Sequence, residues 1–233
     1  MPALATFFAL ALATGAGVGF VLGLIGGGGS ILAVPALVYV VGVPSIHAAI
    51  GTSAIAVAVN AAGSLALRAR DGAIKWRCAV TFAAAGVVGA LIGAELGKAL
   101  DGQKLLALFG LVMIAVGASM LLPQKHPSRD DVRLTRASAR MLAPRLVGMG
   151  LVVGLLSGFF GIGGGFLIVP GLVWATRMPL RDAIGASLVA VAAFGLTTSA
   201  SYAVSGHIDA GLAALVIAGG LVGGFLGTRA SAT

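Results

Sequence analysis

The stretch Gly26-Gly27-Gly28-Gly29-Ser30-Ile31-Leu32-Ala33-Val34-Pro35 interrupts a hydrophobic segment that would otherwise read as one long helix. Each glycine in a helix interior costs about 1 kcal/mol relative to alanine, so four in succession predict that the helix ends there. The same pattern returns as Gly161-Ile162-Gly163-Gly164-Gly165-Phe166-Leu167-Ile168-Val169-Pro170. Two such breaks at corresponding points of two halves are typical of duplicated transporter folds, which place the substrate site there.

The composition is that of a membrane protein. Of 233 residues, 59% are hydrophobic and 9% are charged, and the mean hydropathy is +1.08. Soluble domains carry about 25% charged residues. Several apolar runs are long enough to cross a bilayer, and they lack the alternation of polar and apolar residues that a membrane β-barrel shows. We therefore predict an all-α polytopic membrane protein.

Other classes of protein are disfavoured. The net charge of +8 comes from basic residues in the gaps between apolar runs, where cytoplasmic loops carry them, so it does not indicate nucleic-acid binding. The single cysteine, Cys78, allows neither a disulfide nor a cysteine-based metal site within one chain. The spans contain no HExxH motif, no paired carboxylates and no Cys–His pairing. We expect no enzyme activity, no cofactor and no bound metal.

The two halves of the chain match residue by residue. At an offset of 135 residues the matched pairs are Gly19/Gly154, Gly23/Gly158, Gly28/Gly163, Gly29/Gly164, Pro35/Pro170 and Pro44/Pro179. One residue then drops out, and at an offset of 134 the pairs are Gly51/Gly185, Ser53/Ser187, Gly72/Gly206, Gly86/Gly220, Gly89/Gly223 and Gly93/Gly227. This predicts a first transmembrane repeat over 1–122, a basic linker over 123–145 and a second repeat over 146–233. Residues 105–122 have no counterpart, so we expect the second repeat to lack its last helix, through loss or through truncation of the sequence.

Basic residues divide unequally between the two sides of the predicted bundle. When the spans are traced from Met1, thirteen of the fifteen Lys and Arg residues fall on the opposite side, and only Lys98 and Lys104 fall on the side of Met1. Basic residues mark the cytoplasmic face. We therefore expect a multi-pass protein of a bacterial inner membrane with the linker in the cytoplasm.

Matched loops carry opposite charge bias. The loop 68–77 holds four basic residues and its counterpart 205–209 holds none, whereas the turn at Pro44 holds none and its counterpart 177–181 holds two. This exchange indicates an inverted repeat, whose halves sit upside down to each other in the membrane.

The segments that flank each glycine break are short for full spans, in particular 166–176. We therefore expect re-entrant hairpins whose glycine tips meet near the midplane from opposite faces, since non-helical backbone is tolerated there only when protein or a wet cavity surrounds it. The helices that begin at Ser30 and Gly165 would point their N-termini at the meeting place. Their N–H groups and positive dipole ends would form an anion site without buried Lys or Arg.

The predicted substrate-binding residues are glycines of both breaks together with small polar residues inside the spans. They are Gly26, Gly27, Gly28, Gly29, Ser30, Ser53, Asn60, Gly161, Gly163, Gly164, Gly165, Ser187 and Thr198. The alternative for the glycines is close helix packing, which accounts for Gly86, Gly89 and Gly93 but poorly for four consecutive glycines. For the polar side chains the alternative is hydrogen bonding between helices.

Three titratable residues and one basic segment have two interpretations each. Glu95, inside an apolar run but near its end, is a proton-coupling candidate or simply reaches the headgroups. His47 and His207 flank turns and are surface histidines or pH-sensitive gating residues. Within the linker, one helical face would carry Arg129, Arg133, Arg136 and Arg140. That segment is a solvated connection or a surface helix on anionic lipid.

The glycine blocks that end in proline, Gly51–Ser53 with Gly185–Ser187, and the repeated Gly86/Gly89/Gly93 spacing resemble the sulfite exporter TauE/SafE family of membrane permeases. The resemblance implies transport of sulfur-containing anions such as sulfite, sulfoacetate, thiosulfate or other organosulfonates, although some relatives carry other small carboxylate-type anions. Our interpretation is a secondary transporter of a small sulfur-containing anion. The alternatives are an anion channel and a transporter of a carboxylate-type solute, and a homodimer is one assembly that the sequence allows.

Overall fold

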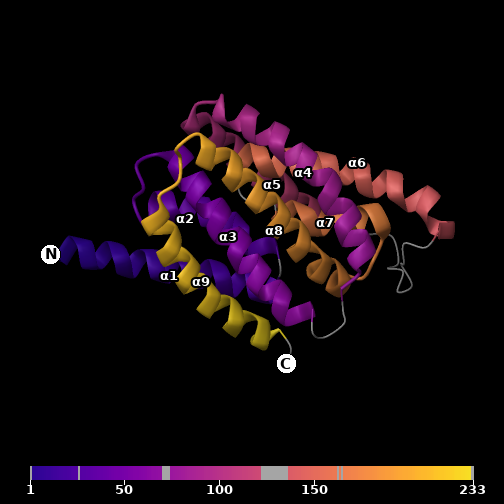
Figure 1. Ribbon diagram of the computed structural model, residues 1–233, viewed down its shortest axis with the longest axis horizontal. Coiled ribbons are helices and arrows are strands. Elements are labelled where there is room, and N and C mark those ends of the chain that lie inside the picture. Colours follow the sequence, from indigo (N-terminus) through magenta and orange to yellow (C-terminus); the bar gives the residue numbers. More distant parts are fainter. Residues whose placement is uncertain are drawn as a thin grey trace.

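Helices form all the secondary structure of the residues that the computed structural model describes, which are 2–25, 27–69, 74–121, 136–161, 163 and 165–231. In chain order the helices are α1 (Pro2–Ile25), the 3₁₀ helix η1 (Gly27–Leu32), α2 (Ala33–Tyr39), α3 (Ile46–Ala69), α4 (Trp76–Lys98), α5 (Gly102–Leu121), α6 (Arg136–Phe160), α7 (Gly165–Thr176), α8 (Leu180–Val204) and α9 (Ala210–Ala230) (Figure 1). The prediction of an all-α protein is confirmed.

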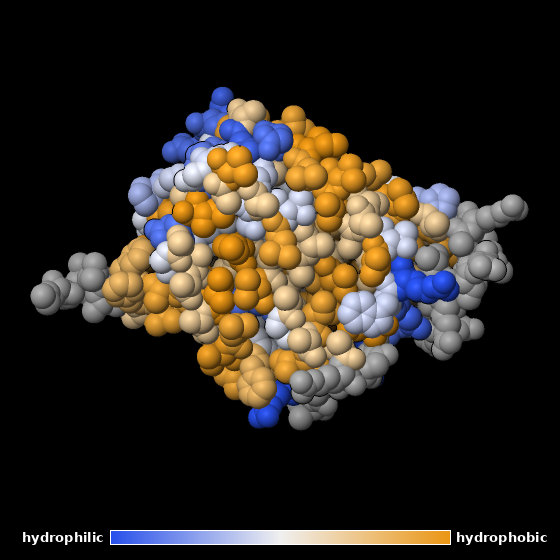
Figure 2. All heavy atoms as spheres, in the orientation of Figure 1, coloured by the Kyte–Doolittle hydropathy of each residue, from blue (hydrophilic) through white to orange (hydrophobic). Residues whose placement is uncertain are grey.

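Six segments of the described chain are long and apolar enough to cross a bilayer. They are Thr6–Ile25, Ile46–Ala69, Trp76–Lys98, Leu142–Phe160, Leu180–Val204 and Ala210–Ala230. Figure 2 shows the matching surface pattern, a broad hydrophobic band across the visible face with hydrophilic groups gathered at the upper left and toward the lower right and bottom. The chain is a multi-pass membrane protein.

The two arms of each glycine-broken hairpin differ in length. The first arms, α1 and α6, have 24 and 25 residues, and both contain a segment long enough to span. The returning arms are short, since α7 has 12 residues and reaches about 18 Å at 1.5 Å per residue. Only the second, returning arm of each hairpin is therefore short, whereas we expected both arms to be short. One reason is that α6 begins at Arg136, inside the segment predicted as linker, whereas Arg129 and Arg133 lie outside the described residues.

Two helix pairs pack backbone against backbone through glycines. In Figure 1, α1 runs beside α9 and α4 beside α6. A Cβ added to Gly19 on α1 would overlap the carbonyl oxygen of Gly220 on α9, and a Cβ added to Gly154 on α6 would overlap that of Gly86 on α4. Gly19 matches Gly154 and Gly220 matches Gly86 in the sequence repeat. The same small-residue contact therefore occurs twice, each time between a helix of the first half and a helix of the second.

The partners of the remaining matched glycines repeat as well. Gly93 on α4 faces the carbonyl oxygen of Leu155 on α6, and its counterpart Gly227 on α9 faces that of Phe20 on α1. Leu155 and Phe20 are themselves 135 residues apart. Around these pairs α3 packs against α8, α3 against α9 and α4 against α8. The duplication seen in the sequence thus reappears in the packing of the helices. In this packing, Gly86 and Gly93 allow close contact between helices.

The bundle has two chemically distinct ends. At the arginine end, where α1, α3 and α9 finish and α4 and α8 begin, Arg68 Nη2 donates 2.8 Å hydrogen bonds to Gly23 O and Ser231 Oγ. Lys75 pairs there with Asp182 at 3.4 Å. At the histidine end, where α4 and α8 finish and α3, α5 and α9 begin, Lys98 Nζ donates to Ser205 Oγ at 3.0 Å.

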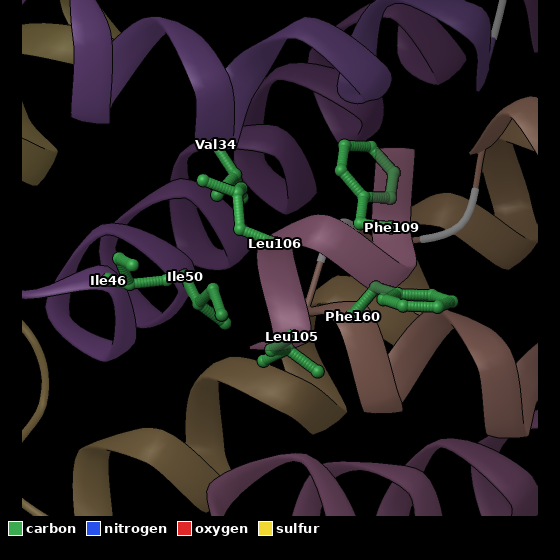
Figure 3. A pocket seen from close by; sticks show the side chains of 7 residues that line it. All are labelled: Val34, Ile46, Ile50, Leu105, Leu106, Phe109 and Phe160. Atoms are coloured by element: carbon green, nitrogen blue, oxygen red, sulfur yellow. The ribbon is translucent and has the colours of Figure 1, made fainter. Parts of the chain in front are cut away.

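Apolar side chains from several helices gather near the histidine end of the bundle (Figure 3). Leu105, Leu106 and Phe109 of α5 face Ile46 and Ile50 of α3. Val34 and Phe160 complete the group, and they leave a void of only about 10 Å³. Since α5 supplies three of these side chains, it contributes much of this apolar cluster.

The glycine packing gives a testable pattern of stability. We expect Gly93→Ala and its counterpart Gly227→Ala each to lower stability by about 1–3 kcal/mol, because the new methyl group would meet backbone that cannot yield. Gly17→Ala and Gly148→Ala face open space and should be neutral or slightly stabilising. Thermal unfolding in detergent, followed by gel filtration, measures the difference. Equal melting temperatures for the four variants would contradict the packing role.

Candidate functional site

The first glycine break returns the chain along α1. Gly29 lies so close to α1 that an added Cβ would overlap the backbone nitrogen of Leu22. Gly28 has more room, since its added Cβ would meet only the side chain of Ile25, at 3.4 Å. Gly29 is therefore needed for the hairpin itself, whereas packing does not require glycine at position 28. Gly27 begins η1, and Gly26 lies outside the described residues.

The second break uses left-handed backbone. Gly161 has φ of 68° and Gly163 has φ of 67°, a region that side-chain-bearing residues rarely adopt. A Cβ at Gly161 would also overlap the side chain of Ile50. A Cβ at Gly163 would lie 3.3 Å from Val57 Cγ1 on α3 and 3.7 Å from Val191 Cγ1 on α8. Gly164 lies outside the described residues.

The two glycine breaks are joined by a buried hydrogen bond. The backbone N–H of Gly165, the first residue of α7, donates to Ser30 Oγ in η1 at 3.1 Å. Ser30 has no exposed surface. Ser30 and Gly165 are matched positions of the repeat, and so are Val57 and Val191 beside Gly163. The two breaks therefore contact each other at corresponding positions of the two halves.

The meeting point offers polar groups without a charged side chain in the contacts just described. The first N–H groups of a helix lack partners within that helix, and the dipole of α7 places partial positive charge at this end. One of these donors is taken by the Ser30 hydroxyl. The arrangement combines backbone donors, one hydroxyl and valine side chains, which is the chemistry that can hold a small anion after partial dehydration.

Ser53 and Ser187 use their hydroxyls inside their own helices. Ser53 Oγ donates to Ile50 O at 2.9 Å, and Ser187 Oγ donates to Ile184 O at 2.8 Å. Both residues are buried, and the two bonds are repeat counterparts of each other. The structure thus brings Ser30 and Gly165 together, and the bonds described for Ser53 and Ser187 lie within α3 and α8.

Asn60 and Thr198 are buried polar residues in the spans. Asn60 is 2% exposed, and within the described chain neither of its amide atoms has a hydrogen-bond partner. It lines a cavity of about 180 Å³ between α3 and α9 together with Ser64, whose hydroxyl also lacks a described partner. Thr198 Oγ1 also has no hydrogen-bond partner within the described chain. Sequence reasoning missed Ser64, although it matches Thr198 at the offset of 134 and was detectable in that way.

Glu95 lies at the histidine end, in the last turn of α4. Its side chain is 68% exposed, pairs with Lys98 Nζ at 2.8 Å and accepts a hydrogen bond from Ser201 Oγ at 2.8 Å. This position agrees with a carboxylate that reaches the headgroup region. A proton-coupling role for Glu95 stays a prediction.

His47 and His207 lie together rather than separately on the surface. Their ring centroids are 5.8 Å apart, and each is 6.3 Å from the ring of Tyr202. Tyr202 is fully buried and both histidines are partly buried. The three side chains form one aromatic cluster at the histidine end.

Comparison with known proteins assigns the chain to a family. Residues 11–233 match the family described as Sulfite exporter TauE/SafE. A probable membrane transporter protein of Xylella fastidiosa is 49% identical over 217 residues, which cover 93% of this chain and 82% of the relative. The probable membrane transporter protein YunE of Bacillus subtilis is 27% identical over 94% of this chain and 87% of its own length. No solved structure matches the chain.

The contact between the breaks predicts unequal effects of two serine substitutions. Ser30→Ala should lower stability by about 1–3 kcal/mol, because the buried Gly165 N–H loses its acceptor. Ser53→Ala removes only a bond within α3 and should cost less than about 1 kcal/mol. Thermal unfolding of both variants in the same detergent makes the comparison. A smaller loss for Ser30→Ala than for Ser53→Ala would contradict the contact.

Proposed function

Because this chain belongs to the sulfite exporter TauE/SafE family of membrane transporters, we propose that it is a secondary transporter that moves a small sulfur-containing anion across a bacterial inner membrane. The observation that carries this proposal is the buried contact between Ser30 and Gly165, where the two glycine breaks meet. Broken helices that meet at a repeat axis are where transporters of this general design bind their substrates.

The substrate would be held by the backbone rather than by charged side chains. A sulfite or sulfonate oxygen would take the place of the Ser30 hydroxyl as acceptor for the Gly165 N–H, with the positive end of α7 favouring the negative charge. Gly28 has room beside it, so its backbone is a further candidate contact. The substrate-binding set would comprise the glycines of both breaks with Ser30, and Ser53, Asn60, Ser187 and Thr198 would support it from the surrounding helices.

The orientation follows from the distribution of basic residues. Arg68, Lys75 and Arg181 lie at the arginine end, and Lys98 lies at the histidine end. Cytoplasmic segments carry the excess of basic residues, so the arginine end would face the cytoplasm. The two halves would then be inverted relative to each other, since the matched helices α4 and α9 finish at opposite ends.

Uptake of labelled anions into proteoliposomes tests the proposed activity. We expect at least one of sulfite, thiosulfate and sulfoacetate to accumulate above its equilibrium level, and a protonophore or another ionophore to abolish the accumulation. Gly28→Ala should lower uptake several-fold at unchanged melting temperature, since the methyl group fits the fold but enters the site. Equilibration without accumulation would indicate a channel instead. Normal uptake by Gly28→Ala would indicate that the substrate does not bind beside Gly28.

Cysteine labelling tests the inverted orientation. Ala99 and Ser231 are exposed residues directly after the matched helices α4 and α9. In a Cys78→Ala background, Ser231→Cys should react with an impermeant thiol reagent from the cytoplasmic side only, and Ala99→Cys from the outer side only. Labelling of both cysteines from one side would exclude the inverted repeat.

A further inference from the structure

An open cavity of about 320 Å³ lies at the arginine end, between the ends of α1, α3 and α9 and the beginning of α8. Its lining combines two arginines, Arg68 and Arg181, two hydroxyl residues, Thr228 and Ser231, and aliphatic side chains. Its volume is in the usual range for small-molecule sites. We propose that this cavity is a second anion-binding site, a vestibule in which Arg68 and Arg181 hold a sulfonate or sulfite group on its way to or from the glycine breaks. The proposal rests on the transport function proposed above.

Arg68 is fixed in place at the wall of the cavity. Its Nη2 donates to Gly23 O at 2.8 Å, at the C-terminal end of α1, and to Ser231 Oγ at 2.8 Å. The negative end of the α1 dipole stabilises a cation at this point. Gly23 precedes the glycine break by only a few residues, so Arg68 is held at the segment of α1 that leads into the break.

Arg181 supplies positive charge from the opposite wall. It lies in the first turn of α8 and is exposed, so its side chain can move toward a ligand. No carboxylate belongs to the described lining, and the neighbouring Asp182 faces Lys75, with which it pairs at 3.4 Å. Two guanidinium groups over a partly apolar cavity attract an anion more strongly than exposed arginines in open water, because the dielectric constant is lower there.

The repeat shows that the fold does not require arginine at these positions. The counterparts of Arg68 and Arg181 at the histidine end are Tyr202 and His47, and the counterpart of Ile184 is Ile50. Tyr202 is fully buried beside His47, and Ile50 is part of the apolar cluster in Figure 3. The same helix framework thus carries a tyrosine and a histidine at these positions at one end, and two arginines at the other. This difference favours a role in binding over a role in folding.

Thiol reactivity inside the cavity tests the proposal independently of transport. For each variant in a Cys78→Ala background, the measured quantity is the rate of labelling by an anionic methanethiosulfonate reagent divided by the rate for its cationic analogue. This ratio should be about fivefold higher for Thr228→Cys than for Ala99→Cys, which lies outside the cavity. Arg181→Gln should remove most of this preference. Arg177→Gln, which removes an exposed arginine four residues away that does not line the cavity, should leave most of it. Melting temperatures establish that each variant is folded.

Protection by a soluble anion provides the second measurement. Methanesulfonate, which does not consume the reagent, should slow labelling of Thr228→Cys several-fold more than chloride does at equal ionic strength. Slowing by phosphatidylglycerol but not by methanesulfonate would assign the arginines to a lipid headgroup and overturn the proposal. Absence of both charge preference and protection, in protein that still transports, would overturn the vestibule and leave the transport function intact. Preference and protection in protein without transport would support the vestibule and contradict only the transport function.

Discussion

The close contact between glycine-lined helices is the constraint on which the rest of this structure depends. Lipid tails are as apolar as leucine side chains, so helices in a membrane gain little from burying apolar surface and associate largely through tight packing. Here Gly19 and Gly154 let α1 touch α9 and α6 touch α4 at backbone distance. These contacts fix the first arm of each hairpin shortly before its glycine break, and thereby fix where the breaks arrive.

The two breaks lie together because the glycine-lined helix pairs α1–α9 and α4–α6 repeat each other's packing. The N–H of Gly165 then finds the hydroxyl of Ser30, its own counterpart in the other half. Non-helical backbone inside a membrane protein needs partners supplied by protein, and the breaks partly provide them for each other. In the proposed transporter, the same contact would present backbone donors to an anion.

The two halves share an arrangement of matched helices but differ in the side chains at several matched positions. Arg68 corresponds to Tyr202, Arg181 to His47 and Asn60 to Phe194. Phe194 fills the space beside Gly86, whereas Asn60 stands in the equivalent place beside Gly220 and adjoins a cavity. In addition, α5 contributes leucine and phenylalanine side chains to the cluster at the histidine end. The two ends of the described bundle thus differ in the side chains that they carry.

The sequence by itself determined the helical membrane class, the positions of the glycine breaks, the duplication and the grouping of basic loops, because hydropathy, glycine runs and charge are properties of local stretches. It also predicted that the helices beginning at Ser30 and Gly165 would direct their N-termini to one place, because the glycine breaks interrupt both halves at corresponding points. It did not reveal that α1 and α6 are long first arms, that Ser53 and Ser187 bond within their own helices, or that Arg68 and Arg181 line one cavity. Only the tertiary structure decided these points, because they depend on how far each helix extends and on which side chains of distant segments face one another.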